Sequence, residues 1–129
     1  DIYPQTYIHI YIYTSTAKSN NIAEMEDALE VDININTADQ FGNTLLILAA
    51  QQGSKRMCKF LLRRGANINL QSLVGNTVLH YCYAYSQFEL GEYLKNKGAD
   101  DSILNADEMT CYEGLNEEAL AEDEEEDYI

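Results

Sequence analysis

The chain has 129 residues, of which 46% are hydrophobic, so it is long enough for one domain but not for two. It has 22 acidic and 8 basic residues, and this net charge of −14 disfavours non-specific binding to nucleic acid or an anionic membrane. No apolar run approaches the roughly 20 residues that a membrane span needs. The three cysteines, Cys58, Cys82 and Cys111, are too widely spaced for a disulfide framework or a zinc site, which favours a reducing compartment. We therefore expect an intracellular, cytoplasmic protein without membrane insertion.

The first residues lack both an initial Met and the basic start of a signal peptide, which leaves a processed chain or a fragment open. Residues 1–19 contain an alternating run of β-branched and aromatic side chains, Ile8–Tyr13, which by propensity favours a strand. A repeat found further along the chain instead places a helix near residues 11–18. We expect a degenerate first helix or an extended arm packed on the repeats. A run rich in Tyr and Ile is also what repetitive AT-rich DNA encodes, so non-native sequence is a further interpretation.

The sequence repeats itself with a period of 33 residues. Seven pairs of identical residues share this offset without a gap: Gly42 and Gly75, Asn43 and Asn76, Thr44 and Thr77, Leu46 and Leu79, Leu61 and Leu94, Gly65 and Gly98, and Ala66 and Ala99. Two complete units therefore cover residues 39–71 and 72–104, with a degenerate unit before them and a truncated one after. Together they predict a repeat domain over residues 20–116.

The local signals within a unit predict one supersecondary motif. Residues 39–42 predict a tight turn that ends on Gly42, a residue able to take a positive φ. Thr44 is placed to cap a helix over residues 45–51, and a second helix with a wide apolar face is expected over residues 55–64. Gly65 ends this second helix and leads into the next unit.

These motifs resemble the ankyrin repeat. Residues 42–50, Gly-Asn-Thr-Leu-Leu-Ile-Leu-Ala-Ala, are similar to the family motif G-x-T-P-L-H-x-A-A. Residues 60–69, Phe-Leu-Leu-Arg-Arg-Gly-Ala-Asn-Ile-Asn, are similar to L-L-L-x-x-G-A-D-V-N. The second unit repeats both motifs over residues 75–80 and 93–100. The resemblance implies an all-α fold, an ankyrin-repeat solenoid of stacked helix-turn-helix units with β-turn fingers.

The chain also departs from the family pattern. The proline that starts the first helix is replaced by Leu45, Val78 and Cys111, which removes a rigid helix start from each unit. Glu113 stands where a histidine is usual, and Lys95 occupies a helix position that is usually apolar. We expect these departures to affect the regularity of the stack more than its existence.

No residue pattern indicates catalysis, so we expect a protein that is not an enzyme and holds no metal or cofactor. His80 follows the Thr-x-Leu of the family motif, where the resemblance implies a histidine that links neighbouring turns by hydrogen bonds. A lone histidine without an assigned partner is weak evidence for an active site. Cys58 and Cys82 are expected to be small core residues. Cys111, at a predicted helix start, is expected to be more exposed, where a helix N-terminus lowers the pKa of a thiol.

The resemblance also implies where a protein partner would bind, namely the finger tips and the first helices. The residues at these positions are Gln40, Phe41, Asn43, Gln51, Gln52, Leu73, Val74, Asn76, Tyr85 and Met109. A β-turn tip has no core to enter, so we expect its apolar side chains to form one partly exposed stripe. The alternative is that each tip only packs on the neighbouring turn.

Two regions of opposite charge offer a second surface. Five of the 8 basic residues fall on one predicted helix: Lys55, Arg56, Lys59, Arg63 and Arg64. Residues 117–127 contain eight acidic side chains, without which the net charge of −14 would be −6. We expect residues 117–129 to form a solvated acidic tail. The basic helix is then either a solvated face or a docking surface for the tail or for an acidic partner.

The favoured interpretation is a non-catalytic protein–protein interaction module, an adaptor that binds a protein partner through its finger tips and concave face. The alternative is a permanent structural subunit of a large intracellular assembly, because two full repeats are few for an independent solenoid.

Overall fold

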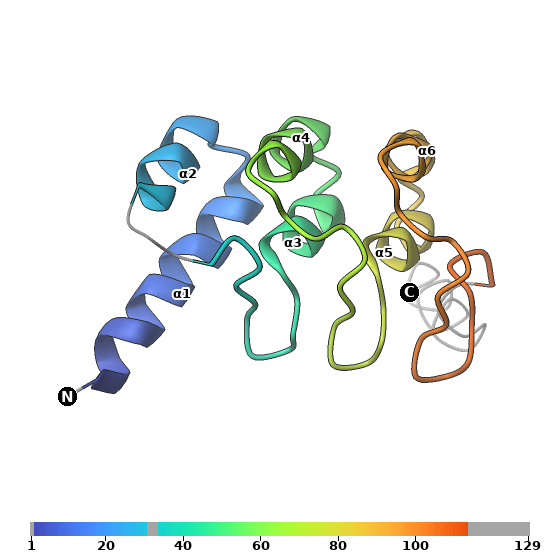
Figure 1. Cartoon of the computed structure of the whole chain (residues 1–129), viewed down its shortest axis with the longest axis horizontal. Helices are drawn as coiled ribbons and strands as arrows, with labels where there is room; N and C mark the ends of the chain where they lie inside the picture. Colours follow the sequence, from blue (N-terminus) through green and yellow to red (C-terminus); the bar gives the residue numbers. More distant parts are fainter. Residues whose placement is uncertain (1, 31–33, 114–129) are drawn as a thin grey trace, which may run out of the picture.

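A computed structural model describes residues 2–30 and 34–113 (Figure 1). The described residues form six α-helices: α1 (Ile2–Ser19), α2 (Ile22–Leu29), α3 (Leu45–Gln51), α4 (Lys55–Arg63), α5 (Val78–Ala84) and α6 (Phe88–Asn96). The predicted acidic tail lies outside the described residues. The predicted helix over residues 45–51 is confirmed, and the next helix ends at Arg63 with Arg64 as its C-cap.

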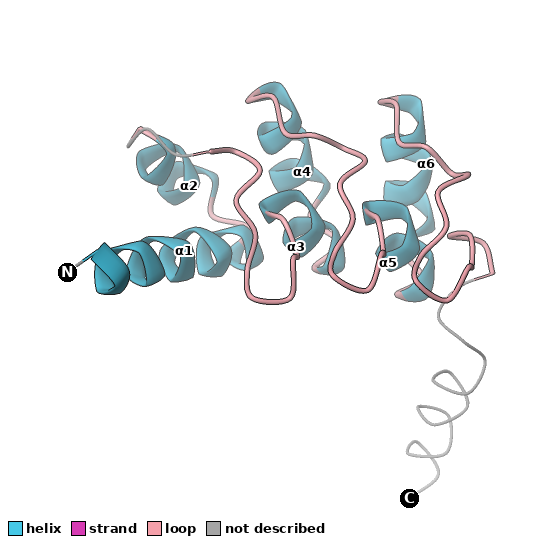
Figure 2. Cartoon of the chain, turned by 60° about the horizontal axis from the view of Figure 1, so that its bottom comes forward, coloured by secondary structure: helices cyan, strands magenta, loops and turns pink. Residues whose placement is uncertain are grey.

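The helices form two layers. Helices α1, α3 and α5 lie in one row and α2, α4 and α6 in a second row, while the loops between the helix pairs project as fingers (Figures 1 and 2). Contacts join the two helices of each pair, and α3 also packs against both α1 and α5. The predicted all-α solenoid of stacked helix-turn-helix units with β-turn fingers is therefore confirmed.

Helix α3 is the centre of the core. The six residues Leu45–Ala50 are all buried because α1, α4 and α5 cover the helix from three sides. Its start is fixed by Thr44, whose Oγ1 accepts a hydrogen bond from the backbone N–H of Ile47 at 3.2 Å. Ser54 caps α4 in the same way, with a bond of 3.1 Å from the N–H of Met57. A hydroxyl cap thus starts each of these helices, and in α3 it does so where the usual proline is replaced by Leu45.

The N-terminal segment is helical rather than extended. Tyr13, Thr14, Thr16 and Ala17 are buried, and this spacing places them on one face of α1, which packs on α2 and α3. The hydroxyl of Thr16 donates to the carbonyl oxygen of Ile12 at 2.7 Å, which satisfies a buried polar group within the helix. Packing on the stack therefore overrides the strand propensity of this segment.

Three fingers repeat one β-turn at the 33-residue spacing. The turn closes with hydrogen bonds from the N–H of Gly42, Gly75 and Glu108 to carbonyl oxygens three residues earlier, at 3.0, 2.8 and 2.9 Å. All three donor residues have a positive φ, of 76°, 81° and 61° respectively. Glu108 therefore adopts in the third finger a conformation that glycine adopts at lower cost.

Replacing Glu108 by glycine is expected to stabilise the chain by about 0.5 to 1 kcal/mol, because it relieves the left-handed backbone of a non-glycine residue. Glu108 is exposed, so little packing is lost. The free energy of unfolding from urea denaturation measures the change. Glu108→Ala removes the same carboxylate but keeps a Cβ, and it is the control that should not stabilise. Equal stabilisation by both variants would show that charge, not backbone strain, is the cause.

The loops that follow the second helix of each unit, α2, α4 and α6, also connect successive units. The N–H of Asn67 donates to Asn36 Oδ1, and 33 residues later the N–H of Asp100 donates to Asn69 Oδ1, both at 2.8 Å. Each asparagine therefore satisfies a backbone donor of the following unit.

Candidate protein-binding surface

The finger tips expose a row of apolar side chains. Phe41, Leu73 and Val74 are 61%, 77% and 58% exposed. The fingers are joined at their tips, because the N–H of Leu73 donates to the Phe41 carbonyl and the N–H of Ala106 to the Val74 carbonyl, both at 3.0 Å. Neighbouring turns, which project side by side (Figure 2), therefore hold each other through the backbone and leave their apolar side chains in solvent.

A polar side chain inside each turn fixes the shape of the finger. Asp39 Oδ1 accepts hydrogen bonds from the N–H groups of Phe41 and Asn43, both at 2.9 Å. Asn105 Oδ1 makes the corresponding bonds in the third finger, at 2.9 and 3.0 Å, to the N–H groups of Asp107 and Met109. The tips are therefore presented by turns with a preset conformation.

The asparagines expected at the fingers link the turns instead of facing solvent. Asn76 is only 5% exposed, and its Oδ1 accepts a hydrogen bond of 3.0 Å from Asn105 Nδ2. Asn43 is half-buried, and its Oδ1 accepts from the Tyr81 hydroxyl at 3.2 Å. The expectation that Asn76 contacts a partner therefore does not fit its burial. Met109 is also half-buried, whereas Gln40 is exposed at the first tip.

The ends of the inner helices add polar and aromatic groups beside the fingers. Tyr85, just after α5, is 51% exposed, and Gln52 after α3 is also exposed, whereas Gln51 is half-buried. The Tyr85 ring stacks on Tyr81, with centroids 6.3 Å apart and planes at 19°. The Tyr81 hydroxyl donates its one proton to Asn43 in the first finger and lies 3.2 Å from Ser72 Oγ, whose hydroxyl can donate to it. Sequence reasoning missed Tyr81, whose only signal is an aromatic residue beside the buried positions of the helix.

His80 is a structural residue that connects α5 to the third finger. It is buried, and its Nδ1 accepts a hydrogen bond of 3.1 Å from the N–H of Thr77. Nδ1 is therefore the unprotonated nitrogen, and the N–H at Nε2 donates to the Met109 carbonyl at 2.9 Å. In the next unit Glu113 replaces the histidine, and its Oε1 accepts from the N–H of Thr110 at 3.1 Å. The carboxylate thus reproduces the helix-start bond of the imidazole.

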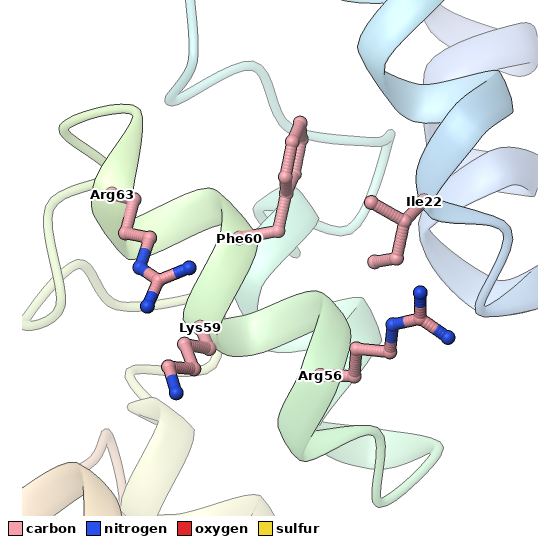
Figure 3. Close-up of a pocket in the computed structure, with 5 residues that line it drawn as sticks. All are labelled: Ile22, Arg56, Lys59, Phe60 and Arg63. Carbon is pink, nitrogen blue, oxygen red and sulfur yellow. The ribbon is translucent and has the colours of Figure 1, made fainter.

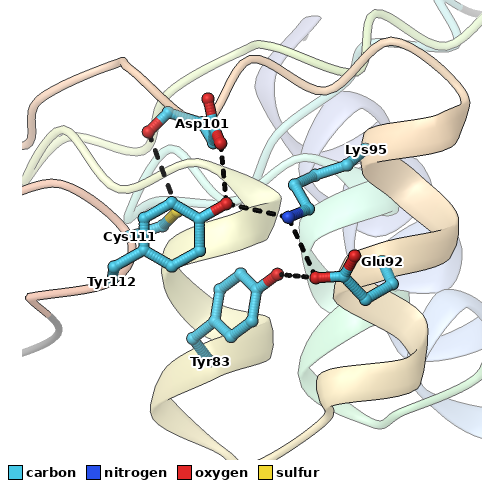
Figure 4. A network of polar contacts seen from close by, with 6 residues as sticks. All are labelled: Tyr83, Glu92, Lys95, Asp101, Cys111 and Tyr112. Atoms are coloured by element: carbon cyan, nitrogen blue, oxygen red, sulfur yellow. Dashed lines mark hydrogen bonds and ion pairs between the residues drawn. The ribbon is translucent and has the colours of Figure 1, made fainter.

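Lys95, at the usually apolar helix position, belongs to a polar network at the end of the described stack (Figure 4). Its Nζ lies 2.9 Å from Glu92 Oε1 and donates to the Tyr112 hydroxyl at 2.8 Å. The Tyr83 hydroxyl also donates to Glu92 at 2.8 Å, and Tyr112 donates to Asp101 at 2.6 Å. Every charge has a partner, so this network joins α5, α6 and the following loop.

The same contacts shift the pKa values in this network. Hydrogen bonds from Lys95 and Tyr83 lower the pKa of Glu92, while those to Tyr112 and Glu92 raise the pKa of Lys95. Burial, followed by the hydrogen bond to Glu92, raises the pKa of Tyr83. Each shift favours the protonation state already present at neutral pH, which fits a structural network.

The cysteines are all buried, and for Cys111 this corrects the expectation of an exposed, acidified thiol. Burial, with Asp101 as the second cause, raises the pKa of Cys111 to about 11. Burial also raises the pKa of Cys58 to about 12 and that of Cys82 to about 12. The loop after α6 covers Cys111, whose Sγ lies 3.9 Å from the Asp101 carbonyl oxygen.

In the folded chain at pH 8, all three thiols are expected to react with a thiol reagent about a hundredfold or more slowly than in denaturant. Only the thiolate reacts, and the raised pKa values leave little of it. Release of a chromophore from an aromatic disulfide reagent, with and without guanidinium chloride, measures the difference. A single rapid thiol in the native chain would contradict the burial of Cys111.

The basic residues of α4 and its C-cap divide into two sets. Lys55 lies 4.7 Å from the centre of the Tyr93 ring, and Arg64 lies 3.7 Å from Glu26. The other three line a hollow with two apolar side chains, and the complete lining is Ile22, Arg56, Lys59, Phe60 and Arg63 (Figure 3). Three of the five predicted basic residues, Arg56, Lys59 and Arg63, therefore lie together on the outer layer of helices.

Within the described residues, no helix is long and apolar enough to cross a bilayer, and no three His, Cys, Asp or Glu side chains converge to hold a metal ion.

Stacked helix pairs with projecting turns define a solenoid, a class of protein whose repeats build extended binding surfaces. The family model described as ankyrin repeats (3 copies) matches residues 14–105. The chain belongs to the ankyrin-repeat family, whose repeats generally mediate protein–protein interaction and are typically non-enzymatic.

Similar proteins carry this repeat within much longer chains. An ankyrin repeat protein of Acanthamoeba polyphaga mimivirus is 40% identical over 73 residues, 56% of this chain and 18% of that protein. Protein fem-1 homolog A-like of Mus musculus is 33% identical over 60 residues, 46% of this chain and 9% of its own. Arf-GAP with coiled-coil, ANK repeat and PH domain-containing protein 2 of Gallus gallus is 34% identical over 76 residues, 57% of this chain and 9% of its own. The chain thus spans less than a fifth of each relative.

Proposed function

We propose that this chain is a non-catalytic interaction module that binds a protein partner through its finger tips and the adjoining ends of the inner helices. The observation that carries the proposal is the row of exposed apolar tips, Phe41, Leu73 and Val74, on turns with a preset conformation. Ordering an exposed loop on binding costs conformational entropy, and turns that are already ordered avoid most of that cost. The tips therefore offer a partner apolar surface to bury, and the turns lose little conformational entropy when it binds.

The chemistry of this surface defines the kind of partner. The sequence has no acidic residue between Asp39 and Glu89, and the first two finger tips are uncharged. Exposed Tyr85 and Gln52 add an aromatic ring and an amide beside the apolar tips. A partner segment with apolar side chains and free backbone hydrogen-bonding groups fits this composition. Its binding is expected to depend little on salt, because no ion pair contributes.

We assign the chain no catalytic role, because its most enzyme-like side chains are used in structural bonds. Both ring nitrogens of His80 are within hydrogen-bond distance of α5 and the third finger, and Lys95 is held by Glu92 and Tyr112. An imidazole used in this way has no free nitrogen to accept a proton from a substrate.

The proposal is tested by affinity capture with matched surface variants. Phe41→Ser and Leu73→Ser remove apolar tips from two different fingers, while Phe88→Ser removes a side chain of similar exposure, 57%, from α6. We expect both tip variants to lose the same captured protein and the control to retain it, with the melting curve unchanged in each. Capture that survives both tip variants but fails with Phe88→Ser would contradict the proposal. A cooperative melt of the isolated chain also separates it from the alternative of a permanent subunit.

A further inference from the structure

The hollow between α2 and α4 has a volume of about 340 Å³ and lies on the outer layer of helices, away from the finger tips (Figures 1 and 3). One wall is apolar and consists of Ile22 and Phe60, which are both half-buried. The rim is cationic and consists of the exposed residues Arg56, Lys59 and Arg63. Because residues 56, 59, 60 and 63 are spaced by three and four, α4 presents them along one face. We call this site the α2–α4 groove.

The cations of the groove have no carboxylate partner in the part of the chain that the structure describes. Among the described residues, no ion pair or ring contact engages Arg56, Lys59 or Arg63, whereas their neighbours Lys55 and Arg64 are both engaged. This is unusual in a chain of net charge −14. Three cations that no described carboxylate neutralises, placed around an apolar wall, create a local positive potential that favours an acidic ligand.

We propose that the α2–α4 groove binds an acidic peptide segment, and that its occupant is the segment 117–129 of this chain. Residues 117–127 carry eight carboxylates for the cationic rim, and Tyr128 and Ile129 follow them with side chains suited to the apolar wall. The segment thus combines, within 13 residues, the two kinds of group that the groove presents. Phe60 and the arginine stems can cover its apolar end while the charged heads remain in water.

The chain is long enough for this contact. From Glu113, the last described residue, 14 residues lead to Asp127, and an extended chain of that length spans about 46 Å. Helix α4 precedes α6 in the outer row (Figure 1), and the two are connected through packed neighbours, since α6 packs on α5, α5 on α3 and α3 on α4. Packed helices lie about 8 to 10 Å apart, so three such spacings remain within reach of the segment. Tethering gives the segment an effective concentration on the order of millimolar, which compensates for the weakness of exposed ion pairs.

Zero-length carbodiimide cross-linking of the full chain tests the contact, because Lys59 is the only amine of the groove lining. At low protein concentration and low salt, we expect mass spectrometry to find Lys59 joined to carboxylates of residues 117–127. Lys18, on α1, is the matched control and should remain unlinked to that segment. About 0.5 M salt should abolish the link. Arg56→Gln with Arg63→Gln should reduce it severalfold, whereas Leu73→Ser should leave it unchanged.

A fluorescent synthetic peptide of residues 117–129 identifies the occupant. We expect it to bind at least about tenfold more tightly to a chain whose acids in 117–127 are changed to amides than to the unchanged chain, in which the segment competes. Equal binding to both chains would overturn the assignment of the chain's own segment and indicate an external acidic partner. Absence of both the cross-link and peptide binding would overturn the groove as a site. Neither outcome depends on the finger tips, so the proposed function is tested separately.

Discussion

Replacing Gly75 by alanine is expected to lower the free energy of unfolding by about 2 to 4 kcal/mol. Gly75 has a φ of +81°, and a Cβ there would lie 2.6 Å from the backbone nitrogen of Ala106 and 3.0 Å from the Cα of Asn105. These are backbone atoms, which cannot move aside as a flexible side chain can. The second and third fingers would have to separate, at the expense of the bond from Ala106 N–H to the Val74 carbonyl.

Gly98 offers a matched control for this variant. It also has a positive φ, of +107°, but apart from its two chain neighbours no described residue has an atom within 4 Å of a Cβ added there. Gly98→Ala is therefore expected to cost about 1 kcal/mol, from the backbone conformation alone. Urea denaturation of both variants measures the difference. If the two costs are the same, the close approach of neighbouring fingers contributes nothing to stability.

Replacing His80 by alanine is expected to cost about 3 to 5 kcal/mol, a large part of the stability of a small domain. The substitution leaves a cavity, since the imidazole is 1% exposed. It also leaves the buried N–H of Thr77 without its acceptor and removes one of the two donors to the Met109 carbonyl, which keeps its bond of 2.9 Å from the N–H of Asn105. The variant therefore loses both packing and the link between α5 and the third finger. Thermal and urea unfolding followed by circular dichroism measure the loss.

His80→Leu separates these two effects. Ile47 occupies the equivalent position one unit earlier and is buried, which shows that this position can accept an aliphatic side chain. The leucine variant should recover most of the packing and retain a loss of about 2 kcal/mol, from the unsatisfied N–H of Thr77 and the lost bond to the Met109 carbonyl. A leucine variant as stable as the unchanged chain would show that the imidazole bonds are not needed.

The repeat could be predicted from the sequence because single residues determine each local conformation. Gly42 and Gly75 take the positive φ that the turns require, and Thr44 starts α3 at the predicted residue. These signals are local, so they hold wherever the unit occurs. Glu108 shows the limit of this approach, since its side chain gives no sign of a left-handed backbone, which only the 33-residue register indicates.

The N-terminal helix could not be predicted with the same certainty. The alternation in Ile8–Tyr13 favours a strand in isolation, whereas the observed helix buries Tyr13, Thr14 and Ala17 in the stack. The decisive energy is tertiary, because α1 packs on both α2 and α3. A window of local sequence does not contain this contribution.

The exposure of a residue on the candidate surface could be predicted where it is set by one turn alone. It could not be predicted where a residue of the next turn covers it. Phe41 and Leu73 are exposed because a turn tip has no core beneath it. Asn76 is buried because Asn105, one unit later, reaches back to it. The α2–α4 groove likewise requires Ile22, from a degenerate unit whose packing the sequence does not specify.

The hydrogen bonds between units have a consequence for how the domain loses its structure. Each joins one unit to the next, as from Leu73 to Phe41, from Asn67 to Asn36 and from His80 to Met109. Opening any one unit therefore removes bonds from its neighbour, so partly open forms are penalised. The stack should melt in one cooperative step, with equal calorimetric and van't Hoff enthalpies, instead of fraying unit by unit from an end.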